Sequence, residues 1–182
     1  MNTRYIVKNR RRREGRTNYR KRIRLLTSEM PIVRFRKGSK SLTAQITFFE
    51  PKGDRTISSV NSSELKKFGW NLSGKNIPAA YLTGLLFARK NKGSKTGEII
   101  IDFGIKKPAN GSVSYAFLKG AIDGGLKILC SDAAFPSEDR INGKHISSFY
   151  SSKHQKSQFS KTPEAGKIEK LVSEVKERII KG

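Results

Sequence analysis

Residues 1–27 carry side chains suited to binding phosphate groups. This segment holds eleven of the 38 lysines and arginines and a single acid, Glu14. Arginine and lysine bind phosphate oxygens, and Tyr5 and Asn9 among them suit base stacking and backbone contacts. Because so dense a charge repels itself, we predict an RNA-binding arm that folds when RNA neutralises it. A solvated surface or a localisation signal is the alternative. The candidate RNA contacts of the arm are Arg4, Lys8, Arg10, Arg11, Arg12, Arg13, Arg16, Asn18, Tyr19, Arg20, Lys21, Arg22 and Arg24.

A second basic set lies on a predicted β-hairpin. Val33 and Phe35 alternate with polar residues, and the turn 37–40 leads into a second alternating run at 42–49. One face of this hairpin is apolar, and the other face with the tip could contact a shallow RNA groove. An exposed face kept polar for solubility alone is the competing interpretation. The candidate RNA contacts of the hairpin are Arg34, Arg36, Lys37, Lys40 and Gln45.

The charge of the whole chain points to a polyanionic partner. The net charge of +23 would oppose compaction unless the protein sits against such a partner, and nucleic acid fits better than a membrane surface. No apolar run is long enough to span a bilayer and the N-terminus lacks a signal-peptide core, so we expect a cytosolic or nuclear protein. DNA compaction is a further alternative.

Catalytic and metal-binding arrangements are weak in this sequence. The four aspartates Asp54, Asp102, Asp123 and Asp132 could form a two-metal nuclease centre, but their positions fit turns and element ends. The string Asp102–Gly104 matches a kinase metal-binding motif by chance, because the accompanying motifs are missing. The lone Cys130 and the two histidines are not spaced as zinc ligands. Cys130 is expected to be a small buried hydrophobic residue. We expect no enzyme, no cofactor and no small-molecule substrate.

Periodicity predicts the elements that position these residues. The pattern begins with a helix from Thr17 and continues as a β-meander, after which helices and strands alternate. The chain therefore predicts an α/β fold, a mixed sheet covered by helices. The elements after the hairpin are a strand over 56–60, a short helix capped by Ser62 or Ser63, a helix over 77–90 begun by Asn76 and Pro78, a strand over 98–103 buried on both faces, a helix capped by Ser112, and a strand over 126–129.

The C-terminal third is predicted to be looser. Residues 147–160 are rich in Ser, Lys and Gln and predict an extended segment, followed by a terminal helix capped by Thr162 with Pro163 in its first position. Its apolar stripe should pack on its own domain, with docking on a neighbour as the alternative. We divide the chain into an arm (1–27), an α/β domain (28–130) and a C-terminal segment with its helix (131–182).

Six blocks along the chain resemble one known family: residues 11–26, 53–56, 62–65, 78–86, 119–126 and 139–146. They are similar, in the same order, to the 5S rRNA-binding large-subunit ribosomal protein, the L-eighteen family, of the archaeal and eukaryotic-like type. The chain departs from that family in two features. Asn18 stands where the family usually has Asp, and the C-terminal region of the family is usually longer than in this chain and often acidic.

The resemblance implies a structural constituent of the large subunit of the cytoplasmic ribosome. It implies a ribonuclease-H-like topology without catalysis, and binding to 5S rRNA in the central protuberance. It also implies contacts with large-subunit rRNA and a neighbouring 5S-binding ribosomal protein. By the same resemblance, residues 10–24 and 34–40 are the RNA contacts, which adds Ser39 to the hairpin set.

Overall fold

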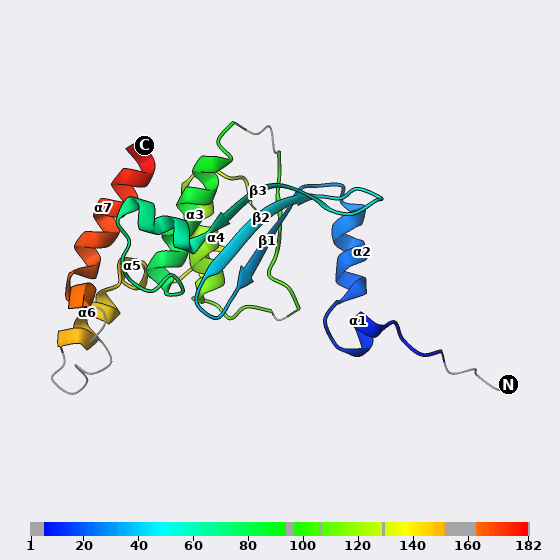
Figure 1. Ribbon diagram of the computed structural model, residues 1–182, viewed down its shortest axis with the longest axis horizontal. Helices are drawn as coiled ribbons and strands as arrows, with labels where there is room; N and C mark the ends of the chain where they lie inside the picture. Colours follow the sequence, from blue (N-terminus) through cyan, green and yellow to red (C-terminus); the bar gives the residue numbers. More distant parts are fainter. Residues whose placement is uncertain (1–5, 94–96, 106, 129, 152–162, 182) are drawn as a thin grey trace.

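A four-stranded mixed sheet forms the centre of the computed structural model, which describes residues 6–93, 97–105, 107–128, 130–151 and 163–181. Its strand order is β3-β2-β1-β4. The first three strands form the predicted antiparallel meander, and β4 pairs with β1 in parallel (Figure 1). The helix-covered mixed sheet expected from the sequence is confirmed. The strands are β1 (Ile32–Lys37), β2 (Leu42–Phe48), β3 (Arg55–Asn61) and β4 (Ile100–Asp102).

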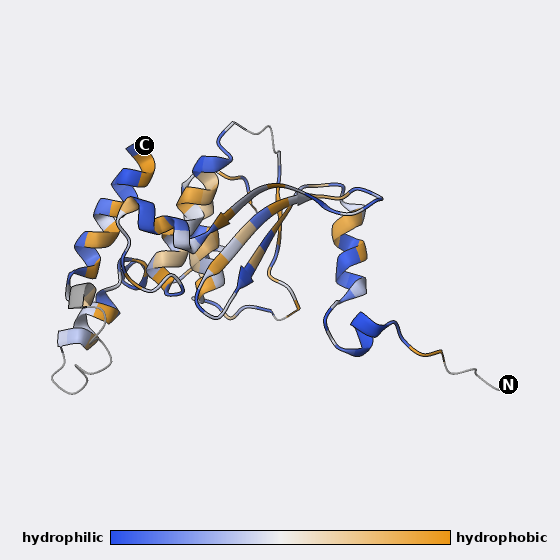
Figure 2. Ribbon diagram, in the orientation of Figure 1, coloured by the Kyte–Doolittle hydropathy of each residue, from blue (hydrophilic) through white to orange (hydrophobic). Residues whose placement is uncertain are grey.

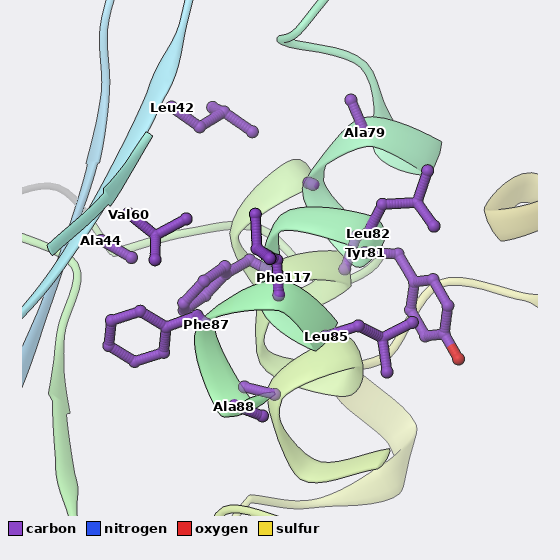
Figure 3. Close-up of a cluster of buried hydrophobic side chains, with 14 of the residues drawn as sticks. Leu42, Ala44, Val60, Ala79, Tyr81, Leu82, Leu85, Phe87, Ala88 and Phe117 are labelled. Atoms are coloured by element: carbon purple, nitrogen blue, oxygen red, sulfur yellow. The ribbon is translucent and has the colours of Figure 1, made fainter. Parts of the chain in front are cut away.

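Two helices cover one face of this sheet. Helix α3 (Ile77–Lys90) begins where predicted, with the Asn76 side chain accepting a hydrogen bond from the Ala79 amide at 2.9 Å and Pro78 in the first turn. Helix α4 (Val113–Asp123) packs beside it. Figure 3 shows Ala44 and Val60 of the sheet facing Phe87 and Phe117 of these helices. The core lies between the sheet and this helical layer.

The C-terminal helix α7 (Ile168–Lys181) completes the same core. Its stripe of Ile168, Val172, Val175 and Ile179 is buried, so the predicted packing on its own body is confirmed. Thr162, the predicted cap, lies outside the described residues, and Pro163 starts a 3₁₀ turn, so the α-helix begins later than expected. The other, smaller elements are η1 (Ser62–Phe68), η2 (Asp132–Ala134), α5 (Glu138–Asn142), α6 (Lys144–Ser151) and η4 (Pro163–Lys167).

Two strand predictions are wrong in part. Residues 126–128 form no strand, although the Ile99 amide donates to the Lys127 carbonyl at 3.1 Å. Leu126 and Ile128 are apolar because they are buried in the core, which a short run cannot distinguish from strand pairing. Strand β4 covers only residues 100–102 and, in the described part of the chain, pairs with β1 alone. Ile100 and Ile101 are therefore half-buried rather than buried on both faces.

Three local predictions also need correction. Residues 147–151 are helical, as part of α6, because the α6 helix packs against η4 and α7; the rest of the predicted extended segment is not described. The cap of η1 is Asn61, in a capping box with Glu64, because the Ser62 hydroxyl accepts from the Leu42 amide instead. Ser112 occupies the cap position of α4 without a side-chain cap bond.

Candidate nucleic-acid interface

The basic arm, which was expected to fold only when RNA neutralises its charge, already forms two helices on the side of the sheet opposite α3 and α4, because carboxylates of the body pair with two of its cations. These are α1 (Arg10–Arg13) and α2 (Tyr19–Thr27), and they stand at the end of the molecule far from α7 (Figure 1). Asn18 begins α2 by accepting a hydrogen bond from the Lys21 amide at 3.1 Å. Figure 2 shows hydrophilic residues along α1 and on much of α2, whereas apolar residues are frequent in the strands and in α3 and α4. Arg4 lies outside the described residues.

Asp102 joins the arm to the sheet from one side of β1. It ends β4, and its Oδ1 lies 2.7 Å from Lys21 Nζ in α2, while its Oδ2 lies 2.7 Å from Arg36 Nη2 in β1. The Gly104 amide also donates to Oδ1, at 3.0 Å, so Asp102 caps the loop that follows β4, in keeping with its expected position at a strand end. Arg36 donates further to the Phe35 and Asp102 carbonyls, so its guanidinium is held by the body of the protein.

Asp54 makes the equivalent connection from the other side of β1. It follows the turn before β3, and its Oδ2 accepts hydrogen bonds from Arg34 of β1 and from Arg22 of α2, the latter at a longer 3.3 Å. Its side chain is 15% exposed and that of Asp102 is 12% exposed, so both carboxylates are largely shielded from water. Each aspartate therefore holds one cation of α2 and one arginine of β1.

The charged state of Asp102 is strongly favoured. Burial by itself raises the pKa of this carboxyl, but hydrogen bonds from Lys21, Arg36 and the Gly104 amide outweigh it and lower the pKa from 3.8 to about 2. Asp102 is consequently ionised at any physiological pH, and its two ion pairs persist there.

A cationic cavity of about 130 Å³ lies between α2 and the sheet. Its apolar part is formed by Leu25 and Leu26 of α2, Ile32 of β1 and Ile105, and Asp102 is the acid that lines it. Excess positive charge around so small a space favours an anion, and phosphate is the anion that RNA offers. The basic residues that line it are Arg11, Arg16, Lys21, Arg22, Arg34 and Arg36.

The cations of the arm differ in whether their side chains have partners within the protein. Arg10 and Arg16 pair with Glu14, and Arg11 Nε donates to the Thr17 hydroxyl at 2.9 Å. In the described part of the chain, several arm cations make no side-chain ion pair or hydrogen bond and project into solvent. These unpaired arm cations are Lys8, Arg12, Arg13, Arg20 and Arg24.

The hairpin candidates divide between two places. Gln45 lies on the open sheet face, opposite Arg34 in the register of β1 and β2. Lys37 ends β1, and Ser39 and Lys40 belong to the turn that follows it; none of the three lines the cavity. The Ser39 carbonyl accepts from Lys75 Nζ at 3.1 Å. Tyr19 is half-buried in the first turn of α2. The structure thus unites the arm with Arg34 and Arg36 but not with the hairpin tip.

The aspartates that organise the site were not predicted as parts of it. Asp54 and Asp102 were expected only as turn and strand-end residues, because their pairing with the arm gives no local signal. Among the residues that the structure describes, no three His, Cys, Asp or Glu side chains are grouped to hold a metal ion. No helix of the described segments is long and apolar enough to cross a membrane. Cys130 is partly buried and packs against the core, and burial raises the pKa of its thiol.

The fold and this basic surface define an α/β protein with a cationic arm, and comparison with known proteins assigns its family. A family described as "Ribosomal large subunit proteins 60S L5, and 50S L18" matches residues 3–96. The chain belongs to this family.

Similar proteins come from archaea, and each bears the name "Large ribosomal subunit protein uL18". The protein of Korarchaeum cryptofilum is 42% identical over 181 residues, covering 97% of this chain and 93% of the relative. Those of Methanoregula boonei and Methanothrix thermoacetophila are 44% and 48% identical, covering 80% and 79% of this chain and 84% and 85% of the relatives. The archaeal type and the large subunit of the cytoplasmic ribosome, both expected from the sequence, are confirmed.

Proposed function

We propose that the chain binds 5S rRNA and helps to anchor it in the central protuberance of the large ribosomal subunit. Contacts with large-subunit rRNA and with a neighbouring 5S-binding ribosomal protein belong to the same proposal. The observation that carries it is the set of unpaired arm cations, held beside a cationic cavity on the open side of the sheet. Family membership supports the choice of ribosomal RNA over other polyanions.

The three segments have separate tasks in this proposal. Residues 1–27 supply the phosphate contacts, and residues 28–130 supply the sheet against which the arm is held. Residues 131–182 supply helices that add Ile141, Ile168 and Val175 to the hydrophobic core. The hairpin tip, with Lys37 and Lys40, provides a second contact region apart from the arm.

The test compares the salt dependence of 5S rRNA binding in charge-removal variants of the full chain. Replacing Arg12 and Arg13 by Gln should lower the slope of log K against log salt by roughly 0.7–0.9 for each phosphate group that is no longer neutralised. The matched control replaces Lys167 and Lys170 by Gln, which removes the same charge from the α7 end. An equal fall in slope for both pairs would show non-specific attraction, and an unchanged slope for the arm pair would refute the clamp.

We further propose that the chain has no catalytic role. Asp54 and Asp102 are each bound by two cations that line the cavity, which leaves these carboxylates poorly suited to hold Mg²⁺. Labelled RNA incubated with the protein and Mg²⁺ should stay intact. Cleavage that disappears in Asp102→Asn would instead establish the nuclease alternative, and preferential binding of duplex DNA over 5S rRNA would favour the DNA-compacting one.

A further inference from the structure

The two aspartates connect the arm to the sheet in the same pattern. Lys21 and Arg22 are consecutive in α2, and Arg34 and Arg36 are alternate residues of β1, so the two arginines point to the same face of the sheet. Asp102 joins Lys21 to Arg36, and Asp54 joins Arg22 to Arg34.

The two aspartates pair with α2 from opposite sides of β1. In the sheet order β3-β2-β1-β4, Asp102 lies on the β4 side and Asp54 lies at the start of β3. Two anchoring points on different sides restrain a helix against rotation, which one ion pair cannot do. The Leu25 and Leu26 side chains that line the cavity with Ile32 add an apolar contact between the same two elements.

Placing acids here works against RNA binding if charge alone is considered. Each carboxylate lies within a few ångströms of the proposed phosphate-binding cations, so it repels phosphate and neutralises cations that could contact RNA. Arg36 illustrates this, because its guanidinium already donates to two carbonyls and a carboxylate of the protein. An arrangement that lowers the electrostatic attraction needs a compensating gain, and holding the arm in place provides one.

We propose that Asp54 and Asp102 are positioning residues for RNA binding, an inference that rests on the proposed 5S rRNA function. They hold α2 against the open sheet face before RNA arrives, so the unpaired arm cations already lie in their binding arrangement. Lys21, Arg22, Arg34 and Arg36 act through these carboxylates rather than chiefly as phosphate ligands. Ordering the arm in advance reduces the conformational entropy lost on binding and raises the fraction of binding-competent protein.

The test relies on the direction in which the affinity for RNA changes, because loss of negative charge and loss of positioning predict opposite changes. Asp102→Asn and Asp54→Asn each remove a negative charge, so electrostatics alone would tighten RNA binding. We expect weaker binding of 5S rRNA instead, by about tenfold if the competent fraction falls to about one in ten. Binding of a homopolymeric RNA, which needs no fixed arm geometry, should stay unchanged or tighten. The loss should therefore appear as reduced specificity.

The matched control is Glu14→Gln. Glu14 is an arm acid that pairs only with the exposed Arg10 and Arg16 among the described residues, so its removal changes the charge equally without releasing α2 from the sheet. This variant should bind 5S rRNA as tightly as the unmodified protein or more tightly. If both Asn variants behave like Glu14→Gln, the positioning role is refuted.

Two further measurements separate the possible failures. The unmodified protein is tested first, and if it does not select 5S rRNA over homopolymer, the proposed function fails before the inference is reached. Trypsin digestion without RNA should cut the arm faster in Asp102→Asn, while the thermal transition of the body is retained. Should Asp102→Asn unfold the body, Lys21→Gln releases the same connection from the arm side, and undiminished 5S binding by that variant would overturn the proposal.

Discussion

Gly120 of α4 lies against the backbone of Tyr81 in α3 so closely that a Cβ atom on it would stand 2.1 Å from the Tyr81 carbonyl oxygen. The contact is reciprocal, because a Cβ on Gly84 of α3 would stand 2.2 Å from the Phe117 carbonyl oxygen. Backbone blocks each position, so no side chain can move aside to make room. The two glycines thus set the separation of the helices that cover the sheet.

Adding one methyl group at this crossing should push the helices apart. We expect Gly120→Ala to lower the free energy of unfolding by about 1–3 kcal/mol or more, since overpacking a tight core forces backbone shifts. Gly97→Ala is the control, because no heavy atom lies within 4 Å of its added Cβ. Urea denaturation of both variants measures the difference, and equal stabilities would contradict the close crossing.

Adjacent isoleucines in α7 test whether the C-terminal helix belongs to the core. Ile179 is 1% exposed and Ile180 is 65% exposed. Ile179→Ala should lower the free energy of unfolding by about 2–5 kcal/mol, whereas Ile180→Ala should change it by less than about 0.5 kcal/mol. A C-terminal helix that only rests on the surface would give two small and similar values in thermal or urea unfolding.

Asn18 should affect RNA binding through the start of α2. Asn18→Ala removes the side-chain acceptor for the Lys21 amide and should destabilise the helix by about 0.5–2 kcal/mol, with weaker 5S rRNA binding as the consequence. Asn18→Asp keeps the acceptor, so helicity and binding should be retained. Helicity is read from circular dichroism and affinity from filter binding. If both substitutions weaken binding equally while helicity is unchanged, Asn18 contacts RNA directly.

The ion pairs of Asp102 should give a distinct dependence of stability on acid. Its pKa is lowered from 3.8 to about 2 in the folded protein, so the folded state binds fewer protons than the unfolded state in this range. The stabilisation is therefore complete above about pH 4 and is lost as the pH falls towards 2. We expect the stability difference between the unmodified protein and Asp102→Asn to shrink over that interval in urea titrations. NMR can follow the titration of the Asp102 carboxyl in the folded protein. A pKa at its ordinary value would contradict the ion pairs.

Local signals in the sequence are sufficient for most of the fold. Asn76, Pro78 and the apolar residues after them define the start of α3, and alternation around Val33 and Phe35 defines the hairpin. These patterns arise within a few neighbouring residues, where backbone preference and one-sided burial act together. The apolar residues at 126–128 were misassigned because burial against helices requires the same residue types as strand pairing.

The arrangement of the site needs information that no local pattern contains. The arm and the sheet arginines are evident from charge alone, yet Lys21 and Asp102 are 81 residues apart and Arg22 and Asp54 are 32 apart. Whether an arginine faces RNA or an internal carboxylate depends on which distant acid the fold brings near. Arg36 and Arg12 carry the same charge in the sequence. Among the described residues, the side chain of Arg36 has hydrogen-bond partners within the protein, and the side chain of Arg12 has none.

The parallel pairing of β1 with β4 also has a consequence for the order in which the newly made chain becomes organised. The arm is made before the sheet, and Asp54 can meet Arg22 as soon as residue 54 has emerged, but Asp102 comes later, at the end of β4. Until that strand has emerged and paired with β1, Lys21 lacks its carboxylate partner and the helix has a single tether. The arm precedes the sheet in the chain, yet α2 is held at both ends of its contact only after the last strand of the sheet has paired.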